Sequence, residues 1–526
     1  MPVSRPPALR RRPLLGAALA SIAAPHLARA AATDALTFAP VTDLLGTDPF
    51  FNASDITTHH VGLVFETLFG MDATLTPRPQ MLEGALIEDD GRRWRLILRE
   101  GLRFHDGEPV RADDAVASIR AWGAIDVFGR KLLAVTDALE AVSDRELRFR
   151  LKKPFPLLAH ALAKPATVIP CIMPRRIAEI AGSGKPIEVI GSGPYRYLPD
   201  ERVAGVRVAY ARFDRYQPRQ DAPSYMAGAR IAHIPRIVWT VIPDPATAAA
   251  SLRKGEVDWV HDVPPDLAPM LRRDANVVVQ IQDFIGGELY MRLNALHPPF
   301  NNPAIRRAVL AGIDQSAFME AAFGADRDLW RVPVGVWSLG KPMSTGAGVE
   351  ALAGDPAKAR RLLAEAGYGG EPVVVLQAVD YPMLSAVAEV GADLLRRIGL
   401  KVDVVPMSYV VANQRGRSAN PPAQGGWNAT FGPFNGYNRY DPAAHIGISS
   451  ANVGAPRMEE IEALRERWFD TPDLAARQAI ARDIQLLVWR DVPYIPLGSY
   501  SPLTAYRRGL EGVMRGGATF FNVRRA

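Results

Sequence analysis

Residues 101–114 read GLRFHDGEPVRADD, and they admit either a catalytic site or an ordinary element of the fold. His105 and Asp106 are adjacent, as a catalytic pair could be, but neighbouring residues of a strand point to opposite faces and would not orient each other. Asp106-Gly107 is typical of a turn, and the acids of 111–114 favour the start of a helix. The stretch therefore predicts a strand, an Asp-Gly turn and a capped helix, with a secreted hydrolase that uses His105 and Asp106 as the alternative.

The N-terminal thirty residues have the pattern of an export signal. An arginine cluster at 10–12 precedes an apolar, alanine-rich segment, and residues 28–30 read Ala-Arg-Ala, a typical cleavage site. The cluster resembles a twin-arginine signal, although the residues after it depart from the usual Phe-Leu, so a Sec signal is the alternative. The apolar run is too short to span a bilayer core of about 30 Å. We expect residues 1–30 to be removed on export to the periplasm.

Charge and cysteine content exclude several classes of partner and site. The net charge of +6 falls to +1 once the five arginines of residues 1–30 are removed, so the basic pI predicts no nucleic-acid partner. Cys171 is the only cysteine, which excludes an internal disulfide and a CxxC zinc site. No cysteine lies near the cleavage site to carry a lipid, so we expect a protein that is not a lipoprotein. Cys171 is predicted to pack as a small apolar group.

The sequence contains none of the common nucleotide-binding, metalloprotease or serine-hydrolase motifs. Its nine histidines are scattered, and His59 and His60 would point about 100° apart on a helix. We predict no catalytic residue, no metal site and no cofactor.

The order of predicted elements indicates a two-lobed α/β protein. Residues 371–379, 382–400 and 400–407 read as strand, helix and strand, which is a βαβ unit. Helices are predicted to begin at Asn302-Pro303, Asp355-Pro356 and Thr471-Pro472, each with a capping side chain before a proline. The chain is expected to leave one lobe near 240–245 and to return near 493–500, and two such crossings allow rotation around a cleft.

The segment QGGWNATFGPFNGYNRYDP at 424–442 is rich in aromatic residues and has no helical or strand period, so it predicts a loop. Packing into the core of an adjoining element is one interpretation of these aromatics. Concave binding sites also favour rigid aromatic walls with a few polar groups. The candidate ligand-binding residues from this segment are Trp427, Tyr437, Arg439 and Tyr440.

Five segments together resemble a known family. They are HHVGLVFETLF at 59–69, GRRWRLILREGLRFHDGEPVRADDAVASI at 91–119, GSGPYRY at 191–197, NPAIRRAVLAGID at 302–314 and DPAKARRLLAEAGY at 355–368. In this order and spacing the chain resembles the extracytoplasmic solute-binding proteins of ABC importers, family 5, the peptide/nickel-binding group.

The resemblance implies the α/β two-lobed periplasmic-binding-protein fold of the large, cluster C type, with an extra subdomain in the first lobe. The expected divisions are lobe I in three parts (31–75, 186–245 and 496–526), an accessory subdomain at 76–185 and lobe II at 246–495.

The resemblance also implies that a monomer traps a small-molecule or peptide ligand between its lobes and delivers it to ABC permease and ATPase subunits, without catalysis. A binding protein that serves a chemoreceptor is the alternative. Dipeptide binders of the family carry an Asp soon after a Gly-Trp pair, whereas here Asn428, Ala429 and Thr430 follow Trp427, which argues against a simple dipeptide. Asp43, Asn52 and Asp55 of the first loop lie where the cleft is expected and complete the candidate ligand-binding residues.

Overall fold

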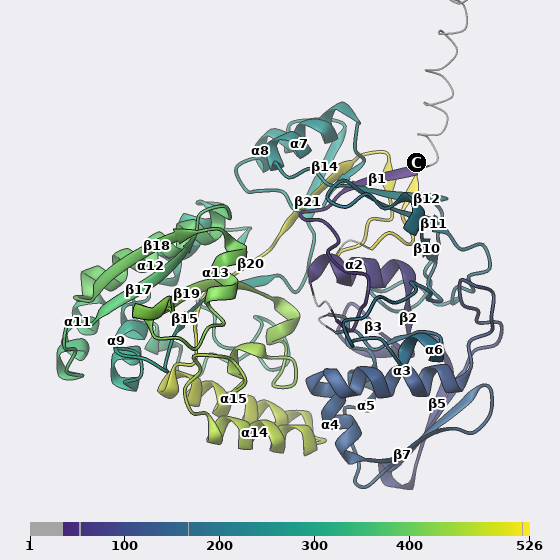
Figure 1. The fold of residues 1–526 in the computed structure, drawn as a ribbon, viewed down its shortest axis with the longest axis horizontal. Coiled ribbons are helices and arrows are strands. Elements are labelled where there is room, and N and C mark those ends of the chain that lie inside the picture. Colours follow the sequence, from purple (N-terminus) through teal and green to yellow (C-terminus); the bar gives the residue numbers. More distant parts are fainter. Residues whose placement is uncertain (1–34, 52–53, 167, 518) are drawn as a thin grey trace, which may run out of the picture.

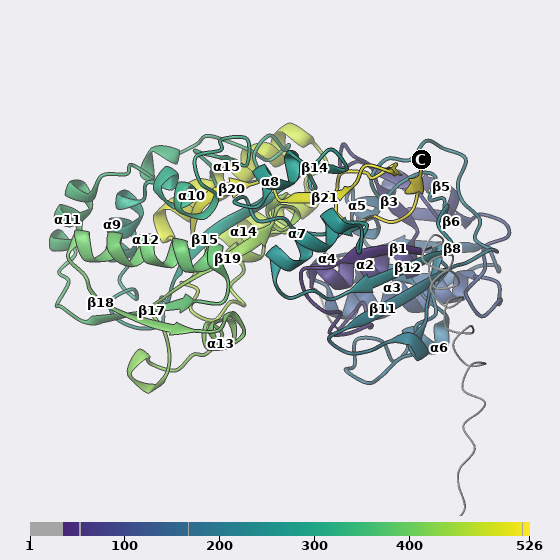
Figure 2. The same cartoon turned by 90° about the horizontal axis from the view of Figure 1, so that it is seen from above.

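The computed structural model describes residues 35–51, 54–166, 168–517 and 519–526. Two lobes lie side by side, each built on its own β-sheet, as the sequence predicted (Figures 1 and 2). The predicted export signal lies outside the described residues, as does Asn52. Within the described part of the chain, no helix has the length and apolar character needed to cross a membrane.

Lobe I is organised around a seven-stranded mixed sheet whose strands come from both ends of the chain. In spatial order the strands are β10 (Tyr195–Tyr197), β11 (Arg207–Arg212), β12 (Arg236–Thr240), β1 (Ala35–Ala39), β13 (Trp259–Val260), β21 (Leu503–Arg507) and β14 (Val277–Ile281). Its helices are α2 (Asp55–Val64), α7 (Pro245–Lys254) and α8 (Ala268–Arg272). Phe38 of the central strand β1 is fully buried against Trp239 and Trp259, with ring centroids 5.7 and 5.4 Å away. The centre of this sheet is therefore an aromatic core.

The sheet pairing corrects both predicted lobe boundaries. Strands β13 and β14 hydrogen-bond within the lobe I sheet, so lobe I continues past residue 245, and the first crossing lies between β14 and β15, at residues 282–286. Strand β20 belongs to lobe II and β21 to lobe I, which puts the return at 501–502 rather than at 496. Helix α7, which Asp244 caps, directly follows the predicted boundary, but a cap marks only a helix start and carries no information about the sheet that the helix covers.

A four-stranded antiparallel sheet with helices forms a separate subdomain next to the sheet of lobe I. Its strands and helices are β5 (Leu82–Glu88), β6 (Arg93–Leu98), β7 (Thr136–Ala141), β8 (Glu146–Leu151), α3 (Ala112–Ile125), α4 (Val127–Val135), α5 (Leu158–Leu162) and α6 (Arg175–Ala178). Two short strand pairs join it to lobe I: β2 (Glu66–Thr67) with β9 (Cys171–Ile172), and β3 (Phe69–Met71) with β4 (Pro77–Pro79). Cys171 is fully buried, as predicted.

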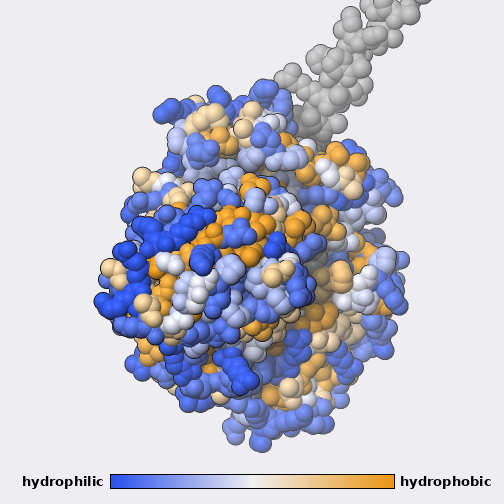
Figure 3. All heavy atoms as spheres, turned by 60° about the vertical axis from the view of Figure 1, so that its left-hand side comes forward, coloured by the Kyte–Doolittle hydropathy of each residue, from blue (hydrophilic) through white to orange (hydrophobic). Residues whose placement is uncertain are grey.

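Lobe II has a six-stranded sheet with helices packed against it. In spatial order the strands are β16 (Trp330–Arg331), β20 (Ile495–Tyr500), β15 (Gly287–Leu293), β19 (Ala429–Asn435), β17 (Pro372–Ala378) and β18 (Lys401–Met407). The helices are α9 (Pro303–Gly312), α10 (Gln315–Phe323), α11 (Pro356–Glu365), α12 (Pro382–Ile398), α13 (Tyr409–Arg415), α14 (Glu459–Asp470) and α15 (Leu474–Asp491). The β17–α12–β18 unit is parallel, as predicted. On the side of the molecule that includes lobe II, hydrophobic residues form a band within a largely hydrophilic surface (Figure 3).

Two local predictions for lobe II are wrong. Residues 429–435, expected in a loop, form the interior strand β19, and a strand buried on both faces need not alternate apolar and polar residues. Helix α15 is capped by Asp473, which accepts a hydrogen bond from the Ala476 amide at 2.8 Å, rather than by Thr471. Thr471 instead ends α14 and donates to the Arg467 carbonyl. The caps Asn302 and Asp355 are confirmed.

The lobes also touch far from the crossings, where α14 meets the accessory subdomain (Figure 1). Phe469 of α14 packs against Phe128 and Phe155, with centroid distances of 5.6 and 6.4 Å. We call these three residues the phenylalanine contact. Two ion pairs flank it, Lys131 with Glu466 and Lys153 with Asp470. The space between the lobes is therefore bounded by covalent crossings at one end and by this contact at the other.

Candidate binding site

A pocket of about 370 Å³ opens on lobe II, within the about 300–1,000 Å³ typical of small-molecule sites. Its lining comes from β15, β19, α13 and the segment 446–453. We call it the arginine pocket; its lining residues are Tyr290, Arg292, Tyr409, Ala412, Asn413, Gly416, Arg417, Thr430, Phe431, Gly432, Phe434, Ile446, Gly447, Ala451, Asn452 and Val453.

Strand pairing explains how the aromatic side of this pocket forms. In the antiparallel β15–β19 pair, Tyr290 lies opposite Gly432. A Cβ atom at Gly432 would lie 2.4 Å from the Tyr290 hydroxyl, so the glycine provides the space that the phenol ring occupies. The ring then stacks on Phe434, with centroids 3.9 Å apart and planes inclined by 25°. The result is a rigid aromatic surface.

The charged groups of the arginine pocket are both cationic. Arg292 lies with its guanidinium 5.1 Å from the centroid of the Trp427 ring and donates to the Val453 carbonyl. Arg417 follows α13 and is exposed. No carboxylate is among the lining residues. The pocket therefore favours an anionic group of a ligand.

Three aspartates lie on the lobe I side, and we call them the acidic group: Asp55, Asp262 and Asp283. Asp55 is the first residue of α2, Asp262 follows β13 and Asp283 lies in the first crossing. Burial raises the pKa of Asp283 to about 6 and raises that of Asp262, and the charge of Asp55 adds to both shifts. The charge of Lys341 opposes the shift of Asp283, and burial lowers the pKa of that lysine. The group is therefore predominantly negative.

Two tyrosines of lobe II lie near the acidic group, and one of them contacts the arginine pocket. Tyr381 packs edge-to-face on Tyr409 of the pocket, with centroids 5.4 Å apart. Burial raises the pKa of Tyr381, and the negative charges of Asp262 and Asp55 from lobe I contribute to that rise. The same two aspartates help to raise the pKa of Tyr500 after burial. The acidic group of lobe I therefore lies near Tyr381, which contacts the arginine pocket of lobe II.

The sequence-predicted site residues lie in several different environments. Trp427 is fully buried behind the arginine pocket, under Arg292, and donates from its indole nitrogen to the Ser418 carbonyl at 3.1 Å. Tyr437 and Tyr440 stack on each other with centroids 5.8 Å apart, and both are buried.

The charged candidates Arg439 and Asp43 each form an ion pair, with different partners. Arg439 is fully buried and pairs with Glu288. Asp43 pairs with Arg202 at 2.7 Å and accepts from the Gly205 amide. Of the predicted set, Asp55 alone belongs to the acidic group.

The pair His105–Asp106 has the structural role that the sequence favoured. Asp106 accepts from the Glu108 amide across the turn, where Gly107 has φ +94°, and it pairs with Arg176 at 3.0 Å. Both ring nitrogens of His105 contact the backbone of residues 191 and 193, at 3.3 and 3.0 Å. Residues 101–104 form only an isolated bridge between Arg103 and Pro109 rather than a regular strand. The two side chains are thus engaged with different partners and do not form a dyad.

A group of potential metal ligands occurs where the sequence indicated none. His59 lies close to His261 and Asp55, and the three donor atoms lie within 4.8 Å of one another. The sequence comparison of His59 with His60 missed this group because its third member is some two hundred residues away. His60 instead contacts the Tyr210 hydroxyl at 2.9 Å.

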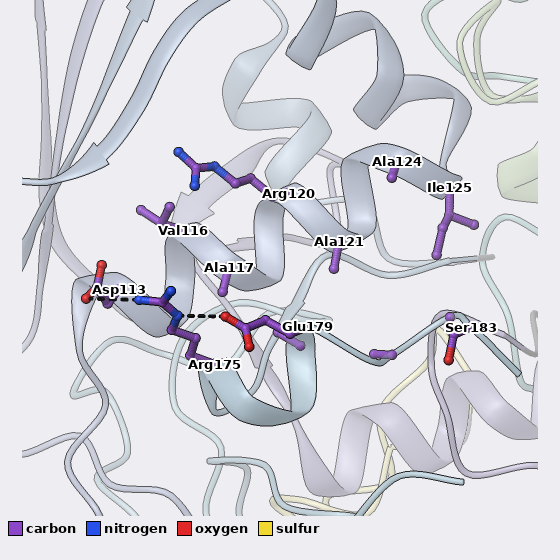
Figure 4. Close-up of a pocket in the computed structure, with 13 residues that line it drawn as sticks. Asp113, Val116, Ala117, Arg120, Ala121, Ala124, Ile125, Arg175, Glu179 and Ser183 are labelled. Atoms are coloured by element: carbon purple, nitrogen blue, oxygen red, sulfur yellow. Dashed lines mark hydrogen bonds and ion pairs between the residues drawn. The ribbon is translucent and has the colours of Figure 1, made fainter. Parts of the chain in front are cut away.

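A second hollow, of about 480 Å³, lies between α3 and α6 of the accessory subdomain (Figure 4). Small side chains of α3 form its floor, and its charges pair with each other: Arg175 lies 2.8 Å from Glu179 and 3.8 Å from Asp113. No residue of the arginine pocket or of the acidic group contributes to it. Arg120, which also lines the hollow, donates to the Leu139 carbonyl. Because the hollow lies within the accessory subdomain and two of its carboxylates already pair with Arg175, we do not assign the binding site to it.

Comparison with known proteins gives matches along almost the whole chain. Residues 76–445 match the model of the bacterial extracellular solute-binding proteins, family 5 Middle. A probable peptide ABC transporter periplasmic-binding protein, y4tO of Sinorhizobium fredii, is 32% identical over 96% of this chain and 97% of its own. The glutathione-binding protein GsiB of Salmonella paratyphi A is 26% identical over 88% of this chain and 89% of its own.

Solved structures share the fold. The periplasmic binding protein DppA of Helicobacter pylori, in complex with the peptide STSA, superimposes with a TM-score of 0.77 at 18% identity, over 93% of this chain and 98% of its own.

Proposed function

Because the chain belongs to family 5 of the bacterial extracellular solute-binding proteins, we propose that it binds a peptide-like solute with a free amine and a free carboxylate between its lobes. As in its family, it serves an ABC importer, and the closed form presents the solute to the permease, which the ATPase subunits drive. His105 and Asp106 are engaged with other partners and are not among the residues that line the arginine pocket.

The observation that carries this proposal is the opposite charge of the two sides of the interlobe space. Arg292 and Arg417 on lobe II suit a carboxylate, and the acidic group suits an ammonium group. A ligand with both groups would contact both lobes only when they are closed, and this difference in contacts is what shifts the population to the closed form. The stacked rings of Tyr290 and Phe434 provide apolar area for a side chain of the solute.

The N-terminal signal supports a periplasmic location. With residues 1–30 removed and no cysteine near the cleavage site, the mature protein is a free, lipid-less monomer that diffuses to its permease. Mass measurement of the protein from the periplasmic fraction tests the processing, and a mass that includes residues 1–30 or a lipid would contradict it.

The experiment for the solute uses matched ligands. Thermal-shift screening of short peptides finds binders, and calorimetry then compares each best peptide with its N-acetylated and its C-amidated form. Both blocked forms should bind more weakly. Failure of every peptide to bind, or equal affinity of free and blocked forms, would contradict the proposal.

Two variants assign the ends of the ligand. Arg417→Ala should weaken binding of the free carboxylate form while leaving the amidated form unaffected. Asp283→Asn should weaken binding of the free amine while leaving the acetylated form unaffected. Arg457→Ala, outside the pocket lining, is the matched control for loss of an arginine.

A further inference from the structure

Asp55, His59 and His261 converge although they come from two segments of lobe I. Asp55 and His59 are one helical turn apart at the start of α2, and His261 follows β13 directly. The Asp55 Oδ2 atom lies 3.5 Å from the Nε2 atom of His261 and 3.8 Å from that of His59. One carboxylate oxygen is therefore close to both imidazole nitrogens.

The distances match a shared cation better than direct hydrogen bonds. An imidazole N–H donated to a carboxylate would bring the two atoms to about 2.7–3.0 Å. Two donors that bind one tetrahedral ion at about 2.1 Å each lie about 3.4 Å apart. The two observed separations from Asp55 lie near the second value, and all three donor atoms lie within 4.8 Å of one another.

The surroundings hold the two rings in place and leave the third ligand open. The rings of His59 and His261 pack edge-to-face with centroids 4.5 Å apart, and His261 also packs on Phe38. The two imidazole side chains are 3% and 5% exposed, whereas that of Asp55 is 55% exposed. An ion bound here would be fixed by buried ligands on one side and accessible from the other.

The accessible side is the interlobe space. The charge of Asp55 contributes to the raised pKa values of Tyr381 and Tyr500 of lobe II and of Asp283 in the crossing, so its exposed carboxylate lies near these residues. Asp262 and Asp283 add negative charge that attracts a cation.

We propose that Asp55, His59 and His261 bind one divalent transition-metal ion, with the remaining coordination positions directed to the interlobe space. Two imidazoles and one carboxylate suit zinc, nickel or cobalt rather than calcium or magnesium. Three protein ligands leave a position for water or for a donor atom of the solute. The site goes beyond the proposed function, because capture of a solute by the arginine pocket and the acidic group requires no metal.

The test uses the mature chain with its affinity tag removed and its metals stripped by a chelator. Calorimetry and elemental analysis with Zn²⁺ and with Ni²⁺ should give one ion per chain, and Co²⁺ should give an absorption spectrum of nitrogen and oxygen ligation. His261→Gln and Asp55→Asn should each weaken binding at least about 100-fold, since loss of an outer-shell contact alone costs about 10–100-fold. His233→Gln, an exposed histidine outside the group, should bind as the unmodified protein does.

The variant Asp55→Asn tests the metal site even if His261→Gln fails to fold, because residue 55 is exposed and asparagine has nearly the same shape as aspartate. Zn²⁺ should raise the melting temperature of the unmodified protein but not that of Asp55→Asn. Absence of binding, or equal binding by Asp55→Asn and the unmodified protein, would overturn the proposal and leave an adventitious ion only. Peptide binding measured in a chelating buffer tests the proposed function separately.

Discussion

Arg439 forms an ion pair with Glu288 inside lobe II, and neither side chain has any exposed surface. Glu288 belongs to β15 and Arg439 ends the short 3₁₀ turn at Gly436–Arg439, after β19, so the pair fastens this turn to the sheet. The sequence had suggested Arg439 as a ligand-binding residue. Its position instead indicates that the guanidinium compensates a buried carboxylate.

Replacement of Arg439 by methionine should destabilise lobe II by about 3–5 kcal/mol, because it leaves the Glu288 carboxylate buried without its counter-ion. The double variant Glu288→Gln/Arg439→Met should recover part of this loss. Denaturant unfolding measures both variants, and solute affinity is determined at a temperature where they remain folded. A stable Arg439→Met variant that no longer binds solute would instead show that Arg439 takes part in ligand binding.

Asp441 should make the protein less stable as the pH rises from about 4 to above 6. Burial raises its pKa to about 6, against the opposing effect of its hydrogen bond to Ala444 and the charges of Arg477 and Arg465. The folded state therefore binds a proton that the unfolded state has released in this range, and the stability gained at low pH is lost as the pH passes the folded-state value.

Asp441→Asn removes this dependence. The variant should gain melting temperature relative to the unmodified protein at pH 7.5 but not at pH 4, with a difference of at most about 3 kcal/mol. Melting curves of both proteins across this range measure the effect. An equal difference at both pH values would show that Asp441 does not titrate in this way.

The phenylalanine contact should favour the closed form through its flanking ion pairs. In Lys131→Glu/Lys153→Glu, like charges would face Glu466 and Asp470 across the lobes and oppose closure. Because exposed pairs contribute little, we expect solute affinity to fall only several-fold. Small-angle scattering should show a larger radius of gyration without solute. Adding Glu466→Lys/Asp470→Lys restores opposite charges and should restore both values; unchanged scattering in the first variant would contradict the idea.

Local and periodic features of the fold could be predicted from the sequence, because the signals are carried by adjacent residues. A capping side chain before a proline located α9 and α11, and the apolar pattern located the β17–α12–β18 unit. The same signals failed where neighbours in space are distant in sequence. The crossing at 282–286 depends on which sheet β13 and β14 join, and no local pattern specifies that pairing.

The same contrast between local signals and distant contacts applies to the candidate site. Asp55 was predicted because it lies in the first loop, where the family's cleft is expected. The sequence around Asp262 and Asp283 does not indicate a binding site, since isolated aspartates near strand ends are common. Their role can be inferred only from the fold, which brings them near Asp55. The aromatic segment 424–442 contains β19, which lines the arginine pocket, but its largest side chain, Trp427, is buried beneath Arg292.

His105 should affect stability and leave solute binding unchanged. Burial lowers its pKa to about 4, so the folded state excludes a proton that the unfolded chain binds below about 6.5. The stabilisation from His105 is therefore present above pH 6.5 and is lost as the pH falls towards 4, which is the opposite of the dependence expected for Asp441.

The variant His105→Gln should be less stable than the unmodified protein at pH 7.5. We expect a loss of about 1–2 kcal/mol, because glutamine replaces the contacts to the backbone of residues 191 and 193 only imperfectly. This deficit should shrink at pH 5, and calorimetry should give the same solute affinity at neutral pH. Hydrolysis of a bound peptide by the unmodified protein, abolished in His105→Gln at equal binding, would instead assign this histidine to catalysis.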